Sequence, residues 1–165
     1  MSQFYYFASH HRMTLTTTST IPNLLNTLQE RLAARSGLAG VQIVSAPLGP
    51  QSTALESIQF GGVVESEQTV ASLGNRRRTE SYQVHGIIWI AKSGAGEQTI
   101  RAARDRAYEL FAELEDELRA DHTVGGTVIR GEIGENALDQ GLSEQGARVA
   151  RITYILNIET QLITR

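Results

Sequence analysis

The 165-residue sequence contains no cysteine, so it forms neither a disulfide framework nor a thiolate zinc site. It also has no apolar run approaching the ~20 residues that a membrane-spanning helix needs, and we expect no membrane association. The aromatic N-terminus has no preceding basic residue and no long apolar core, unlike a secretory signal peptide. The absence of cysteine is compatible with a reducing compartment.

Lysine is almost absent as well. Fourteen of the 15 basic residues are arginine, and Lys92 is the exception. A GC-rich genome explains this bias, and so does a need for planar, bidentate contacts. The net charge of −3 gives no indication of nucleic-acid binding, which usually shows as a strongly basic domain. Length and a 41% apolar fraction fit one domain with a modest core.

Two segments have the apolar periodicity of amphipathic helices. The first covers residues 21–36, where Ser19 or Thr20 can cap the start and Gly37 can end the helix. The second covers residues 97–120, and we expect its outer face to be acidic. The acidic residues on that outer face are Glu109, Glu113, Asp116 and Glu117.

Strand patterns occupy much of the remaining chain. The predicted strands are residues 41–44, 57–65, 68–73, 79–92, 127–133 and 148–162. Gly61 and Gly62 weaken their strand or mark a bulge. Ile87 and Trp89 make strand 79–92 apolar on both faces at one end, so only that end should be covered on both sides. Residues 134–147 are predicted to be a long polar loop.

The order of elements is helix, several strands, helix and two strands. This order predicts an α+β fold in which two main helices flank a mostly antiparallel mixed sheet. We expect residues 19–165 to form this single domain and residues 1–18 to form an N-terminal arm. Exposed apolar patches mark interaction sites, so we expect the arm to dock on another chain through Phe4, Tyr5, Tyr6 and Phe7. Met13 is an alternative start, which would make residues 1–12 dispensable.

The sequence offers little for catalysis. Gly94, Ala95 and Gly96 stand where a phosphate-binding loop would lie, but Thr99 replaces the third glycine, so a flexible turn is the simpler interpretation. None of the four histidines has metal-ligand spacing: His10, His11, His85 and His122. We therefore expect no catalytic residue, no bound metal and no cofactor, and we expect that the protein is not an enzyme.

Four features carry a resemblance to a known family. They are a helix leading to a short strand (24–44), the basic turn LGNRRRTESYQV (73–84), an Ala/Arg-rich helix (100–118) and DHTVGG (121–126) before the last strands. In this order, over about residues 21–162, they resemble the tail terminator proteins of long-tailed, siphovirus-like bacteriophages and phage-derived particles. The aromatic arm departs from the usual start of that family.

The resemblance implies a virion protein that forms a hexameric ring at the head-proximal end of the tail, after assembly in the host cytoplasm. The ring would cap the tail tube and end its polymerisation. Implied partners are other copies of the chain, the tail tube protein and the head–tail connector or stopper protein. DNA would pass through without specific binding. The alternatives are another neck or head-completion protein, or a small α/β ligand-binding domain.

A ring needs two different, complementary patches on each copy. Arg76, Arg77 and Arg78 form either a solvated turn or a contact with an acidic surface on another subunit. We expect them to pair with the acidic face of the second helix, while Ile87 and Trp89 supply apolar contact. The expected interface residues are Phe4, Tyr5, Tyr6, Phe7, Arg76, Arg77, Arg78, Ile87, Trp89, Glu109, Glu113, Asp116 and Glu117.

Overall fold

The computed structural model describes residues 18–49, 52–72 and 77–163. Within these ranges the chain forms two α-helices, one short 3-10 helix and a single five-stranded sheet. The predicted α+β fold and its order of elements are confirmed. Five of the expected interface residues, Phe4 to Phe7 and Arg76, lie outside the described residues.

The two helices form where the apolar periodicity predicted them. Helix α1 (Ile21–Ala33) buries Leu24, Leu28 and Leu32 along one stripe, and α2 (Glu97–Ala120) has the predicted bounds. Helix α1 is shorter than expected, because the chain tightens into the 3-10 helix η1 (Ser36–Leu38) and buries Leu38. No described helix is both long and apolar enough to cross a membrane.

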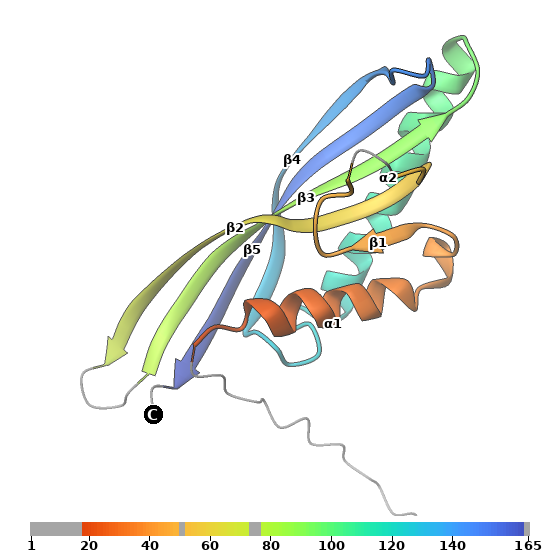
Figure 1. The fold of residues 1–165 in the computed structure, drawn as a ribbon. Coiled ribbons are helices and arrows are strands. Elements are labelled where there is room, and N and C mark those ends of the chain that lie inside the picture. The colour runs from red at the N-terminus through yellow and green to blue at the C-terminus, as the bar shows by residue number, and fades with distance from the viewer. Residues whose placement is uncertain (1–17, 50–51, 73–76, 164–165) are drawn as a thin grey trace, which may run out of the picture.

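The sheet has the strand order β1-β2-β3-β5-β4 (Figure 1). Its strands are β1 (Gln42–Val44), β2 (Glu56–Ser72), β3 (Arg77–Lys92), β4 (Arg130–Leu142) and β5 (Arg148–Ile163). Only β1 and β2 are parallel, and the other pairs are antiparallel. The mostly antiparallel mixed sheet is therefore confirmed.

Two predictions were wrong, one about the division of β2 and one about a loop. The predicted strands 57–65 and 68–73 are parts of one strand, because β2 stays paired with β3 from Glu56 to Ser72. The predicted loop 134–147 is mostly β4, which pairs with β5 from Arg130 to Leu142 and leaves only a tight turn before β5. The polar side chains of β4 give no apolar alternation from which a strand could be predicted. Its register depends on backbone hydrogen bonds to β5 instead.

Both helices cover the same face of the sheet (Figure 1). Side chains that alternate along β3 and β5 point into the core beneath them, among them Ile88, Ile90, Ile152 and Leu156. Beyond α1, the ends of β2, β3 and β5 extend together as a three-stranded ribbon. The helices thus leave the opposite face of the sheet open.

The sheet twists strongly at its middle (Figure 1). Three of its strands, β2, β3 and β4, contain glycines in their interior. Gly61 and Gly62 are extra residues in β2, and Gly134 and Glu135 of β4 together stand opposite the single residue Ile155 of β5. Of the two interpretations of Gly61 and Gly62, a weakened strand or a bulge, the interrupted register agrees with the bulge. Bulges of this kind increase local twist and redirect side chains. Gly86 of β3 lies between the two bulges. The open face of the sheet is therefore bent near Gly86.

Candidate functional site

The open face of the sheet is polar at one end and apolar in its middle. A solvated sheet face normally alternates with the core and carries polar residues. Here Val63, Ile87 and Ile155 lie on the side away from the helices, and Val63 is 53% exposed. An apolar centre on an otherwise solvated face marks a binding surface rather than a simple exterior.

These side chains line a groove of about 430 Å³ that crosses four strands. We call it the central groove. Val63 of β2 and Ala137 of β4 stand at its two sides, and Ile87 and Ile155 lie between them. The two bulges provide Gly62 and Glu135 to its lining, so the glycines that twist the sheet also hollow its open face.

A histidine in the central groove has an unusual environment. His85 of β3 lies opposite Val63, and its Nε2 atom is buried without a hydrogen-bond partner among the described residues. Buried polar atoms nearly always have a partner, so an unsatisfied one needs an explanation.

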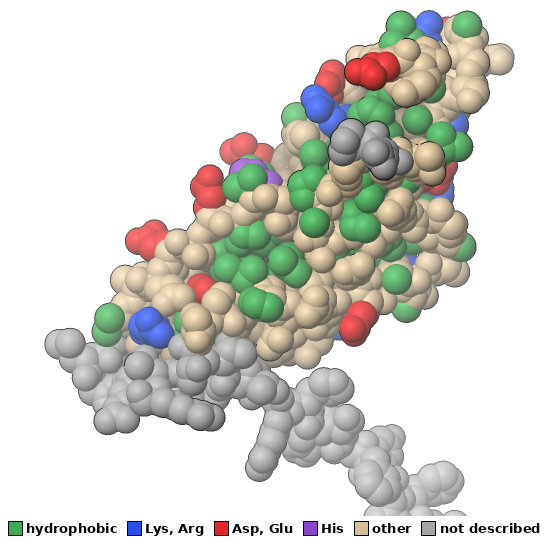
Figure 2. Space-filling model, viewed as in Figure 1, with side chains coloured by type: hydrophobic (Ala, Val, Ile, Leu, Met, Phe, Trp, Pro, Cys, Tyr) green, Lys and Arg blue, Asp and Glu red, His purple; other side chains and the backbone are tan. Residues whose placement is uncertain are grey.

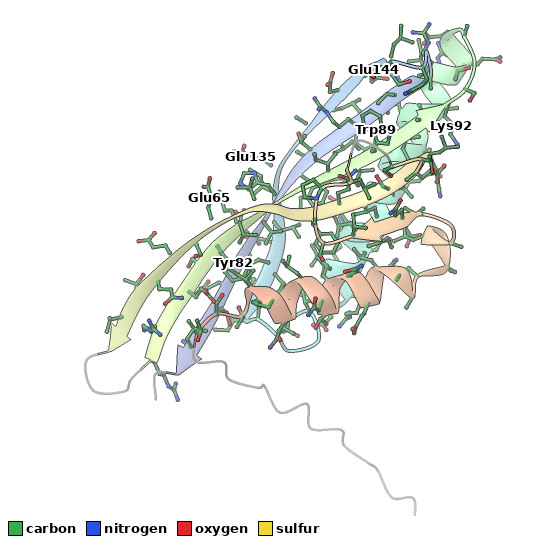
Figure 3. The ribbon with its side chains drawn as sticks, in the orientation of Figure 1. Glu65, Tyr82, Trp89, Lys92, Glu135 and Glu144 are labelled. Carbon is green, nitrogen blue, oxygen red and sulfur yellow. The ribbon has the colours of Figure 1, made fainter. Side chains whose placement is uncertain are left out.

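The rim of the central groove is acidic. Glu65 and Glu135 project from the open side of the sheet, away from α1 (Figure 3). Neither forms an ion pair with another described residue. Acidic side chains follow this edge of the surface, with a histidine among them (Figure 2). The groove therefore favours an occupant that is apolar and positively charged.

A second hollow lies farther along the same face, around Trp89. It is lined by residues 52–55, by Ser93 and Gly94, and by the turn between β4 and β5. Residues 52–55 lead into β2 at this end of the sheet, where Ala91 donates its N–H to the carbonyl of Leu55 at 2.8 Å. Trp89 is half-buried as a result. Ile87, by contrast, lines the open central groove, so the expected cover on both faces of this end of β3 does not extend to Ile87.

The acidic residues of α2 are placed differently from the expectation. Glu117 is not on the outer face: it is 8% exposed and faces α1. It accepts hydrogen bonds from Arg31 Nε at 2.5 Å and from Arg35 Nη1 at 3.0 Å. Glu113 also binds Arg35. The helical periodicity places Glu113 and Glu117 one turn apart, on the side that meets α1.

The other two residues of the predicted acidic face are exposed but already paired. Glu109 accepts a hydrogen bond from Arg106, and Asp116 accepts one from Arg119. All four acidic residues thus have arginine partners within the chain. Burial alone would lower the pKa of Arg31, but its hydrogen bonds to Glu117 and Asp121 raise it. The Arg31 guanidinium between α1 and α2 therefore stays charged.

Asp121 closes the end of α2 and organises the following turn. Its carboxylate accepts hydrogen bonds from the N–H of Thr123, the N–H of Gly125 and Arg31 Nη1. Burial alone would raise the pKa of Asp121, but the hydrogen bonds from Thr123, Gly125 and Arg31 outweigh it and hold the pKa well below its usual range. The DHTVGG motif is therefore a structural turn, in which Gly125 and Gly126 have positive φ.

Sequence reasoning missed a buried polar cluster beneath the start of α1. Glu80 is completely buried on the helix side of β3 and accepts hydrogen bonds from Thr20 N–H at 3.0 Å and Gln68 Nε2 at 3.3 Å. Thr20 occupies the N-cap position, but its hydroxyl binds Glu80 and Tyr82 rather than the helix. Burial raises the pKa of Tyr82, and the charge of Glu80 adds to this. Glu80 lies two residues before Tyr82 on the same strand, so the alternation that predicts a buried Tyr82 also predicts that Glu80 points into the core.

Arg77 and Arg78 begin β3, and Arg77 is exposed. Arg77 and Arg78 therefore lie at the far end of the three-stranded ribbon, away from the acidic residues of α2 (Figure 1). Gly94 and Gly96 have positive φ between β3 and α2, as a tight turn requires. In the part of the chain that the structure describes, no group of three His, Asp or Glu side chains could hold a metal.

The geometry therefore supports binding through a shaped surface, with an apolar groove, an unsatisfied histidine nitrogen and an acidic rim. No protein-family model and no curated protein sequence matches this chain. The open face itself is consequently the main guide to function.

Proposed function

We propose that this chain is a structural ring subunit that caps the tail tube of a long-tailed phage and joins it to the head-side connector. The observation that carries the assembly role is the apolar centre of the open sheet face. Apolar patches of this kind on a folded domain mark surfaces that another molecule covers. The resemblance in the sequence suggests which assembly this is.

Two unlike surfaces support a ring rather than a two-fold dimer. The helix side of each copy carries exposed charged residues of α2, while the opposite side carries the central groove with Glu65 and Glu135. When two unlike surfaces meet, each copy uses one surface for one neighbour and keeps the other surface for the next neighbour. The series of contacts closes into a ring if the rotation between copies allows it. The tail tube and the connector would then meet the two ends of the ring.

The charge pattern suggests a revised pairing between copies. Glu113 and Glu117 already hold Arg35 and Arg31 in place, so they are poor candidates for a second arginine. Glu65 and Glu67 lie on the open face, and neither has an ion-pair partner among the described residues. We propose that Arg77 of one copy meets these carboxylates on the next. Each exposed pair contributes only ~0–1 kcal/mol, so these pairs orient the copies more than they hold them.

Native mass spectrometry and electron microscopy of the full chain test this proposal. We expect a single closed oligomer, a hexamer, with an open centre through which DNA passes without sequence preference. In purified particles the chain should occur as one ring at the head end of the tail. A monomer at high concentration would contradict the assembly role.

The position in the particle separates the proposal from its alternatives. A ring at another level of the neck would indicate a head-completion protein instead. The central groove also lies in the size range of about 300–1,000 Å³ that small-molecule sites occupy. A monomer that binds a small molecule there would support the ligand-binding alternative.

A further inference from the structure

We propose that the central groove holds the aromatic residues of the N-terminal arm (residues 1–18) of a neighbouring copy of this chain. This inference rests on the self-assembly proposed above and adds the segment and the surface that join two copies. The occupant is thus part of the same sequence, and each copy both gives an arm and receives one.

The shape and apolar character of the groove fit the arm. Its lining combines Val63, Ile87, Ile155 and Ala137 in a hollow of about 430 Å³. The arm contains four consecutive aromatic residues, Phe4 to Phe7. In an extended segment, successive side chains point to opposite sides. Two of the four rings would therefore enter the groove, while the other two would face away from it.

The arm can also satisfy the buried histidine nitrogen. His85 Nε2 has no hydrogen-bond partner within the described residues, although it lies buried against the groove. Tyr5 and Tyr6 bring two hydroxyl groups, each of which can donate or accept a hydrogen bond. Nε2 is buried in the single chain, so a tyrosine that enters the groove would pair with His85 after the imidazole ring turns toward it, in either tautomer.

The charges of the arm and the groove rim are complementary. The first acidic residue of the sequence is Glu30, so the arm has no negative side chain. It carries Arg12, which is positive. The rim presents Glu65 and Glu135, which form no ion pair with other described residues. Opposite charges steer association and fix its direction.

The attachment point of the arm favours a neighbour over the same chain. Gln68 Nε2 donates to the carbonyl of Thr18 at 3.0 Å and also binds Glu80, so the arm begins on the helix side of the sheet. The central groove is on the opposite side. In a ring of unlike contacts, the helix side of one copy faces the open side of the next. Phe7 is separated from Thr18 by a span of up to ~40 Å when extended, which is long enough to cross this interface.

The absence of cysteine provides a direct test by disulfide trapping, because the native chain contributes no background. One preparation carries Ser2→Cys or Ala8→Cys, at either end of the four aromatic residues. A second, mass-tagged preparation carries Ala137→Cys, at an exposed groove position. The two are mixed, assembled and oxidised. A matched control places the partner cysteine on exposed α2 instead, as Gln98→Cys.

We expect a mixed disulfide that contains the arm of one copy and Ala137→Cys of another, and none with Gln98→Cys. A ring that forms without the mixed disulfide at either arm position would overturn the arm proposal and leave the ring intact. A disulfide within one chain, in the double variant Ala8→Cys/Ala137→Cys, would also overturn it. A monomer would contradict both the ring and the arm proposal.

A second pair of variants tests the groove itself. Val63→Asp places a carboxylate in the groove, and Val70→Asp places the same group on the same strand but on the opposite side of the sheet. The two valines are 53% and 63% exposed, so neither change should unfold the protein. We expect Val63→Asp to lower the yield of mixed disulfide about tenfold, because a carboxylate would be buried without a partner. Equal yields from the two variants would count against the groove.

Discussion

The ring of Tyr154 lies where a side chain on Gly86 would stand. A Cβ atom added at Gly86 would overlap the Tyr154 ring atoms. Tyr154 extends from β5 across β3 and donates its hydroxyl to the carbonyl of Gln59 on β2 at 3.1 Å. Burial raises the pKa of Tyr154, so its hydroxyl remains a neutral donor. One side chain thus ties three strands together directly behind the central groove.

Replacing Gly86 with Ala should destabilise the protein by about 1–3 kcal/mol, because the added methyl group displaces a fully buried ring. The measurement is the free energy of unfolding in urea. Gly141→Ala is the matched control, since Gly141 is also in a strand but has open space around it. Equal stabilities for the two variants would mean that Tyr154 moves aside without cost.

Replacing Glu117 with Gln should destabilise the protein by about 2 kcal/mol. The change removes the carboxylate that binds both Arg31 and Arg35, and it leaves two partly buried guanidinium groups short of a partner. Asp116→Asn is the control, because Asp116 pairs with Arg119 in an exposed position and should change stability by less than about 0.5 kcal/mol. Urea unfolding of both variants decides the comparison. A larger effect at Asp116 would contradict the placement of Glu117.

The acid stability of the protein should depend on Asp121. Its pKa is lowered in the folded state, so its charged form adds stability above the unfolded pKa of about 3.9, and this contribution is lost as the pH falls below that value. Asp121→Asn should therefore be less stable than the native chain at pH 7 and should lose less stability between pH 5 and pH 3. Urea midpoints across this range measure the effect.

Asp139→Asn is the control for the acid measurements, because Asp139 is 66% exposed in its pair with Arg151. Its stability should follow the native pH profile closely. A native-like profile for Asp121→Asn would show that the hydrogen bonds from Thr123, Gly125 and Arg31 do not set the acid response.

Replacing Arg77 with Ser should weaken assembly and make it less sensitive to salt. An exposed charge at an interface changes association more than the stability of the fold, because salt screens it. Arg101→Ser is the control, since Arg101 is 64% exposed on α2 and pairs with Glu97 of the same helix. Ring formation is measured by native mass spectrometry or sedimentation over a series of salt concentrations. Unchanged assembly and salt response would show that Arg77 is only a solvated residue at the start of β3.

The sequence by itself determined the elements whose own side chains decide their structure. The leucine stripe of α1 and the bounds of α2 follow from helical periodicity, and β3 and β5 follow from alternation. Gly61 and Gly62 indicated a bulge or a weak point in β2. In each case the apolar surface that must be buried lies within the element, so local sequence is sufficient.

Only the tertiary structure decided which faces and partners these elements meet. The strand character of residues 134–142 depends on backbone hydrogen bonds to β5, and the burial of Glu80 depends on the N–H of Thr20, 60 residues earlier. Glu117 looked solvated because its arginine partners are on another helix, 86 and 82 residues away. The central groove arises where bulges in two non-adjacent strands bend the same face. A polar residue's partner is chosen by packing across the fold, and no local pattern encodes that choice.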